Sequence, residues 1–178
     1  MSRESPLAPF AGRTGRAMPV SEPLRLKGID GIKSYAGKHL GTSQWLTIDQ
    51  QRIDLFAEAT GDFDWIHVNP ELAKNGPFGK TIAHGYLTLS MVFALLREIY
   101  VFEDIKMGLN YGIDKLRFPA PVPVDSRIRL DATLKEARDV PDGVQMTVSC
   151  TIECDAVPKP VVVADLVFRF YEARALTS

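Results

Sequence analysis

The side chains best suited to acid–base chemistry gather in one stretch of the sequence, between Thr60 and His84. Asp62 and His67 are five residues apart, and a loop that folds back can bring both side chains onto one water molecule. A carboxylate and an imidazole together can take a proton from that water and return it, because histidine titrates near neutral pH. The alternative is an ordinary loop pair or helix cap, in which the two residues only satisfy each other.

A second group suited to chemistry is a main-chain N–H at the start of a helix. The run Ile82-Ala83-His84-Gly85-Tyr86 leads into a long apolar segment. The first N–H groups of a helix have no partner within it and carry a partial positive charge. Because Gly85 has no side chain, a ligand oxygen can approach its N–H closely, and such a donor stabilises a developing oxyanion by ~3–4 kcal/mol. Alternatively, Gly85 only allows the helix to start against a sheet.

These groups need secondary structure to position them. Residues 84–100 are apolar over most of a helical circumference, which predicts one long helix wrapped by other structure. Before it, the pattern predicts a helix over 28–38, a strand over 42–48 and a helix that ends at Gly61. Thr47-x-x-Gln50 has the sequence of a capping box and opens that second helix. Residues 62–79 are expected to be mostly loop, with one helical turn after Asn69-Pro70.

After the long helix, apolar residues recur at every second position, which predicts strands. The strand candidates are 105–124, 126–140, 144–155 and 161–171, with a hairpin turn at Asp142-Gly143. Prolines at 119, 121 and 123 remove N–H donors on one side only, which suits an edge or an end of a strand. The expected fold class is α+β, with an antiparallel sheet curled around one helix. Pairing of its open edges across a two-fold axis predicts a homodimer.

The whole-chain properties narrow the function class. The 178 residues suffice for one domain. Lys and Arg total 21 against 22 Asp and Glu, so no basic excess favours a nucleic-acid partner. No apolar stretch reaches the ~18 residues of a membrane span. Residues 1–25 are predicted as a disordered extension, with a transit peptide as the alternative, and residues 26–178 as a single domain.

The two cysteines indicate the compartment. Cys150 and Cys154 would lie ~13 Å apart on a strand, which exceeds the ~7 Å limit for a disulfide. Free thiols favour a reducing compartment, so the predicted location is the cytoplasm.

Two motifs carry a resemblance to a known family. The run Phe56-Ala57-x-Ala59-Thr60-Gly61-Asp62-x-x-x-x-His67-x-Asn69-Pro70, followed by Ile82-Ala83-His84-Gly85, resembles the MaoC-like (R)-specific enoyl-CoA hydratase/dehydratase family. Tyr111-Gly112 and the run from Leu116 to Pro123 resemble its single hot dog, NodN-like branch. The resemblance implies a hot dog fold, a homodimer, and reversible hydration of trans-2-enoyl thioesters to (R)-3-hydroxyacyl thioesters.

The resemblance also implies roles for individual residues. Asp62 and His67 match the catalytic pair of the family, and Gly85 matches the glycine whose N–H holds the thioester oxygen. The chain departs from the common pattern at Asp64 and Trp65, which replace an asparagine and a proline. Asp64 would add a carboxylate near the pair and can raise a neighbouring pKa. The reaction needs no metal and no redox cofactor.

Further residues are candidates for substrate binding. His84, beside Gly85, belongs to the predicted site. The candidates for an acyl pocket are Trp65, Ile66, Phe78, Tyr86 and Tyr111, each of which can equally be core packing. The candidates for the phosphates of coenzyme A are Lys74, Lys80, Arg117, Arg127 and Arg129, each of which can equally be a surface charge. Coenzyme A and acyl-carrier protein share a phosphopantetheine arm, so the sequence leaves both open.

Three other functions remain open from the sequence. Asp62, Asp64, His67 and His84 are acceptable metal ligands, which would suit a metal-dependent hydrolase, although the helix-face spacing of zinc sites is absent. A hot dog domain can also bind acyl thioesters without converting them. The same fold can serve a thioesterase, which releases a free thiol.

Overall fold

The computed structural model describes residues 22–172. The predicted extension lies outside the described residues as far as residue 21, and the first strand, β1 (Leu24–Lys27), begins within its last two residues. The domain boundaries therefore remain a prediction. None of the helices between residues 22 and 172 is long and apolar enough to cross a membrane.

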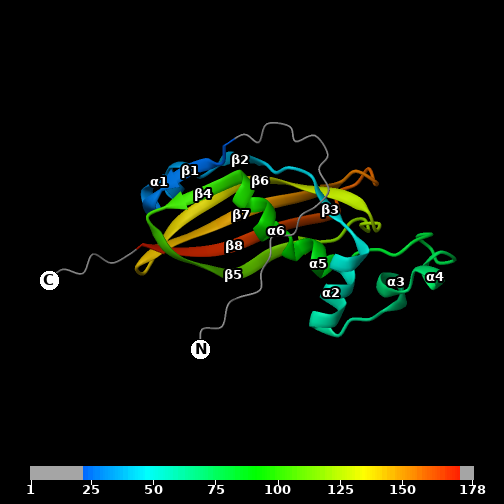
Figure 1. Cartoon of the computed structure of the whole chain (residues 1–178). Coiled ribbons are helices and arrows are strands. Elements are labelled where there is room, and N and C mark those ends of the chain that lie inside the picture. The colour runs from blue at the N-terminus through cyan, green and yellow to red at the C-terminus, as the bar shows by residue number, and fades with distance from the viewer. Residues whose placement is uncertain (1–21, 173–178) are drawn as a thin grey trace, which may run out of the picture.

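The body of the protein is a curved antiparallel sheet with helices on its concave side (Figure 1). The strand order is β2-β6-β7-β8-β5, and β3 pairs with the first residues of β6. The strands are β2 (Lys38–Thr42), β3 (Leu46–Ile48), β5 (Ile105–Arg117), β6 (Ser126–Val140), β7 (Gly143–Cys154) and β8 (Val162–Glu172). β1 pairs in parallel with β4 (Tyr100–Glu103) in a separate two-stranded sheet. The expected α+β, hot dog arrangement is thus confirmed.

The period-two pattern predicted the long strands closely, with two differences. β5 ends at Arg117, because the alternating prolines that follow cannot donate to a ladder and form a connecting segment instead. The hairpin between β6 and β7 turns at Pro141 and Asp142, since Val140 already pairs with Gly143. Asp142 takes the left-handed conformation, with φ of 60°, and Gly143 is the first residue of β7.

The predicted single helix over 84–100 is divided into α5 (Gly85–Ser90) and α6 (Val92–Ile99). The division falls at Met91, which keeps hydrogen bonds to both sides through Leu87 and Leu95. The Ser90 hydroxyl donates to the carbonyl of Tyr86, four residues back, and such bonds bend helices. The break between the two helices thus coincides with a side chain that competes for a helical carbonyl.

The core lies between this helix pair and the sheet. α6 contributes Val92 and Leu95, both fully buried, and the sheet contributes Ile128, Leu130, Leu134, Met146, Val148 and Ile152. Burial of each such side chain stabilises the fold by about 1.5–3 kcal/mol. The sequence predicted a helix that other structure wraps on all sides. The observed helix pair differs, because Tyr86 and Phe93 are exposed in the single chain.

The segment between β3 and α5 leaves the sheet and forms a group of short helices at one end of the molecule (Figure 1). It contains α2 (Gln50–Thr60), α3 (Trp65–Val68) and α4 (Pro70–Ala73), whereas α1 (Gly28–Ser34) lies at the other end. The predicted capping box is wrong: Asp49 is the N-cap of α2, and its carboxylate accepts the N–H of Arg52 at 2.9 Å. Thr47 is unavailable for this role because it belongs to β3.

Candidate active site

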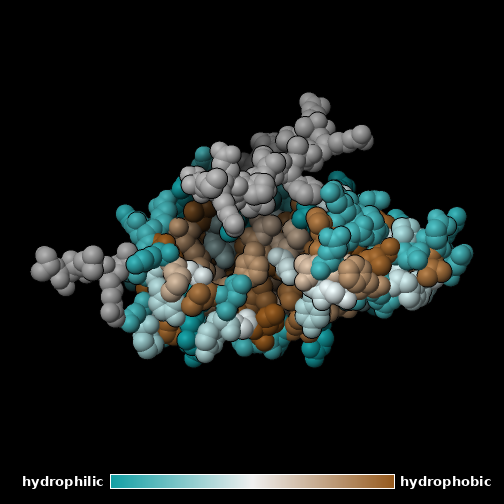
Figure 2. Space-filling model, turned by 60° about the horizontal axis from the view of Figure 1, so that its bottom comes forward, coloured by the Kyte–Doolittle hydropathy of each residue, from teal (hydrophilic) through white to brown (hydrophobic). Residues whose placement is uncertain are grey.

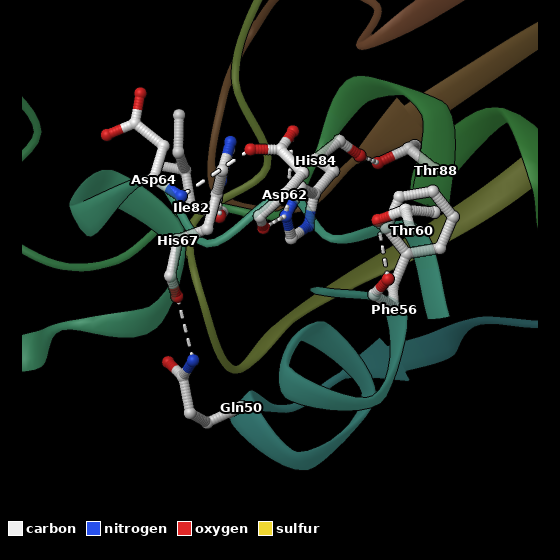
Figure 3. Close-up of polar contacts among 9 residues, drawn as sticks. All are labelled: Gln50, Phe56, Thr60, Asp62, Asp64, His67, Ile82, His84 and Thr88. Carbon is white, nitrogen blue, oxygen red and sulfur yellow. Dashed lines mark hydrogen bonds and ion pairs between the residues drawn. The ribbon is translucent and has the colours of Figure 1, made fainter. Parts of the chain in front are cut away.

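The loop between α2 and α3 brings the predicted pair close together. Gly61 ends α2 in the left-handed conformation, with φ of 76° and its N–H bonded to the carbonyl of Ala57. The chain then turns so that Asp62 and His67, the third residue of α3, face the same space (Figure 3). A carboxylate oxygen of Asp62 and one ring nitrogen each from His67 and His84 all lie within 4.8 Å of one another.

Two bonds from other segments fix His67. Its Nδ1 lies 2.7 Å from the carbonyl oxygen of Ile82, and its own carbonyl accepts a hydrogen bond from Gln50 Nε2 at 2.8 Å. Because a carbonyl only accepts, Nδ1 carries the hydrogen and Nε2 of the neutral ring is left as an acceptor. The buried ring therefore presents a basic nitrogen toward Asp62.

His84 lies directly behind this pair. Its ring stacks on that of His67 with centroids 3.8 Å apart. Its Nε2 donates to the main-chain oxygen of Asp62 at 3.0 Å and lies 4.0 Å from the nearer carboxylate oxygen. Asp62 itself is open to solvent, with 56% of its side chain exposed. The site thus combines an exposed carboxylate with two buried imidazoles.

Gly85 is the first residue of α5, so its N–H has no partner within the helix. Gly85 and His67 both line one cavity of about 360 Å³. The remaining walls come from the turn after α4, the start of α5, the proline-rich segment and the residue before β8: Phe78, Ile82, Ala83, Thr88, Phe118, Pro119, Ala120, Pro121, Val122 and Val161. The cavity is therefore lined mostly by apolar residues, together with His67 and Gly85, and Asp62 lies next to His67 without lining it.

The residues predicted to line an acyl pocket do not all lie at this cavity. Phe78 lines the cavity. Trp65 packs over Gly76, where an added Cβ would lie 2.9 Å from its ring, and half-buried Ile66 anchors the segment by accepting the N–H of Ile82. Tyr86 is exposed and meets Phe118 edge-on at 5.6 Å.

Asp64 and Tyr111 lie apart from the cavity within the single chain. Figure 3 shows the Asp64 carboxylate turned away from His67, while its N–H reaches an Asp62 carboxylate oxygen at 3.5 Å. Tyr111, on β5, lines a different cavity of about 240 Å³ and carries the guanidinium of Arg169 over its ring.

The predicted phosphate-binding cations mostly have other partners. Arg127 and Arg129 pair with Asp155 and Glu153, and Lys80 donates to the carbonyl of Val124. Phe118 was absent from the predicted acyl pocket, although it belongs to the quoted motif. The signal for it was the end of the alternating strand directly before the prolines, which places this aromatic ring opposite the helix start.

Asp62, His67 and His84 are close enough to share one metal ion. A histidine that binds a metal normally donates its other ring N–H to an acceptor. His67 directs one ring N–H to the carbonyl of Ile82, and His84 directs one to the carbonyl of Asp62. A shared metal would therefore require the other nitrogen of each ring, which for His84 is the buried Nδ1.

Comparison with known proteins identifies the family. A family model of the MaoC like domain matches residues 32–154. The chain is 46% identical over 145 residues to 3-hydroxyacyl-thioester dehydratase Z of Mycobacterium tuberculosis, a match that covers 81% of this chain and 96% of the relative. It is 42% identical over 139 residues to nodulation protein N of Rhizobium leguminosarum bv. viciae, covering 75% of this chain and 85% of the relative.

The fold comparison agrees. The R-hydratase PhaJ1 of Pseudomonas aeruginosa superposes with a TM-score of 0.63 at 20% identity, over 78% of this chain and 83% of that one. The curved sheet, the helix pair and the extent of these matches lead to one assignment: the chain is an enzyme that belongs to the MaoC-like family of hydratases and dehydratases.

Proposed function

We propose that the protein catalyses the reversible hydration of trans-2-enoyl thioesters to (R)-3-hydroxyacyl thioesters. The observation that carries the proposal is one cavity that both His67 and Gly85 line, with a carboxylate oxygen of Asp62 within 4.8 Å of a ring nitrogen of His67. The (R) configuration comes from the family resemblance alone.

The chemistry assigns each group one task. A water oxygen attacks the β-carbon of the enoyl thioester, and Asp62 and His67 take the proton that this water loses. The electron pair of the double bond moves toward the carbonyl, so negative charge collects on the thioester oxygen as an enolate. Gly85 N–H stabilises that oxygen, and one member of the pair then protonates the α-carbon. Atoms and charges balance without a metal or a redox cofactor.

The substrate arm is a phosphopantetheine thioester, carried by coenzyme A or by acyl-carrier protein. The apolar cavity walls, with Phe78 and Phe118 among them, suit the acyl part. The reducing cytoplasm remains our proposed location, and it rests on Cys150 and Cys154 alone, which are free and buried.

We propose further that the protein acts as a homodimer. Within the described residues, β5 pairs only with β8, so its other edge is free. β5 carries four exposed apolar side chains (Met107, Leu109, Tyr111 and Ile113), and the exposed Phe93 of α6 lines one cavity together with Tyr111 and Ile113. Figure 2 shows the resulting apolar, hollowed area on this side of the molecule. A second copy that pairs with this edge would cover both features.

The test is the loss of conjugated-enoyl absorbance of crotonyl-CoA, with a thiol reagent in a parallel sample. We expect absorbance to fall without thiol release, and Asp62→Asn and His67→Ala each to lose activity by about 100-fold or more. The matched controls are Asp104→Asn and His39→Ala, which remove an exposed carboxylate and the remaining histidine outside the site.

Other outcomes would select another function. Thiol release would indicate a thioesterase, and binding of crotonyl-CoA without turnover would indicate a binding module or a different acyl chain. Loss of activity in a chelator, restored by added metal, would support a metal-dependent enzyme. Either loss of turnover in His39→Ala equal to that in His67→Ala, or full activity in Asp62→Asn, would contradict the assigned pair.

A further inference from the structure

We propose that His84 is a positioning residue, which holds the loop of Asp62 against the ring of His67 and takes no proton itself. The inference rests on the proposed function and adds a role for a side chain that the mechanism above does not use. It is carried by the contacts of His84, two made by its ring and one by its main chain, which reach three different segments.

The first contact fixes the loop. His84 Nε2 donates to the main-chain oxygen of Asp62 at 3.0 Å, whereas its 4.0 Å separation from the Asp62 carboxylate is too long for a hydrogen bond. The bond therefore sets where the loop lies and leaves both carboxylate oxygens available to water. Figure 3 shows the Asp62 carboxylate beside the stacked imidazole rings of His67 and His84.

The second contact fixes the ring plane of His67. The two imidazoles stack at 3.8 Å with 26° between their planes, and the ring of Phe56 of α2 packs against the His84 ring with centroids 5.0 Å apart. His84 is 3% exposed, so its ring has no room to turn. With Ile82 bonded to the His67 Nδ1, the ring of His67 is held both at its edge and across its face.

The third contact is through the main chain. The carbonyl of His84 accepts the N–H of Thr88 at 3.1 Å and its hydroxyl at 3.2 Å, which starts α5 at the next residue, Gly85. One residue thus links the loop of Asp62, the ring of His67 and the N–H of Gly85. Misplacement of such groups by about 1 Å is enough to reduce a rate by about 100-fold.

A proton relay through His84 does not fit its surroundings. Nε2 carries the hydrogen that Asp62 accepts, so Nδ1 is the bare nitrogen of the neutral ring. Nδ1 is buried and has no hydrogen-bond partner among the described residues. A proton that arrived at Nδ1 would have no further group to move to. The hydrogen bond from Nε2–H to the Asp62 carbonyl is therefore the polar contact through which the side chain acts.

Two substitutions separate this role from plain packing. His84→Phe keeps a flat ring of similar size but removes the donor, and it also removes the unpaired Nδ1, so we expect the melting temperature to hold. His84→Gln places an amide N–H near the position of Nε2 and keeps the donor. With crotonyl-CoA, we expect kcat of His84→Phe to fall about 100-fold while KM changes little. We expect kcat of His84→Gln to be at least tenfold higher than kcat of His84→Phe.

Amide hydrogen exchange over residues 62–66 gives a second readout that needs no turnover. We expect faster exchange in His84→Phe and near-wild-type exchange in His84→Gln, because only the latter can hold the Asp62 carbonyl. Wild-type kcat and exchange in His84→Phe would overturn the proposal. Equal inactivity of both variants with normal exchange would also overturn it, since the imidazole itself would then be required. A wild type that is inactive on crotonyl-CoA would count against the proposed function for this substrate, and exchange would still decide whether His84 holds the Asp62 loop.

Discussion

Replacing Gly85 by alanine tests whether the first N–H of α5 holds the thioester oxygen. A Cβ at Gly85 would lie 3.2 Å from two ring carbons of Phe118 and 3.3 Å from a third. Carbon atoms in good contact are ~3.5–4.0 Å apart. The ring or the start of α5 must therefore shift by a few tenths of an ångström, and the cavity that contains both residues must change shape.

The size of the effect follows from the role of the donor. An oxyanion donor works only within ~2.7–3.1 Å of the oxygen, and its loss costs ~10²–10³ in kcat. A shift of a few tenths of an ångström uses most of that tolerance, so we expect kcat of Gly85→Ala to fall about 100-fold. KM should change less, because the N–H binds the charged enolate more strongly than the uncharged thioester.

The assay is hydration of crotonyl-CoA by wild type, Gly85→Ala, Phe118→Ala and the double variant. If the Phe118 ring forces the shift, Gly85→Ala should lower kcat about tenfold less in the Phe118→Ala background than in the wild type. This difference corresponds to a coupling free energy of about 1.4 kcal/mol. Retention of kcat within about threefold in Gly85→Ala would refute the oxyanion role. A double variant no better than Gly85→Ala would refute the steric explanation.

Three further predictions concern the rest of the fold. Burial raises the pKa of the Cys150 thiol to about 12, so a disulfide reagent at pH 8 should react with it only after unfolding; rapid reaction in the native state would contradict this. Hydrogen bonds from Ser149 and Lys135 hold the pKa of the Asp165 carboxyl below its usual range. Asp165→Asn should therefore cost about 2 kcal/mol in urea unfolding at pH 7. That difference should shrink below about pH 4, as the wild-type carboxyl is protonated; a pH-independent difference would exclude the charge as its source. Asp49→Ala should cost about 1 kcal/mol through loss of the α2 cap, and Asp49→Ser should restore most of it.

The long strands could be predicted from the sequence to within one residue at every end except that of β5. The short strands could not, because the predicted strand over 42–48 is divided into β2 (Lys38–Thr42) and β3 (Leu46–Ile48). Ser126–Val140 matches the predicted strand at both ends, because alternation of apolar residues and the turn after Val140 are local signals. The division of the helix at Met91 could not be predicted in the same way. The apolar run of residues 84–100 is continuous in the sequence. The break coincides with a hydrogen bond from the Ser90 hydroxyl to the helical carbonyl of Tyr86, which the sequence pattern does not reveal.

The sequence singled out Asp62, His67 and His84, which the structure brings together, but it missed Phe118 and could not give the arrangement of the site. A spacing of five residues between Asp62 and His67 allows many geometries, and the observed one depends on a segment that lies farther along the chain. Ile82 donates its N–H to the carbonyl of Ile66 and accepts the Nδ1–H of His67. These two bonds join α3 to the approach of α5. His67 is hydrogen-bonded to Ile82, and His84 follows Ile82 by two residues in the chain, so the two imidazole rings meet. A pattern that spans both segments therefore carries more information than either spacing, since each segment obtains its geometry from the other.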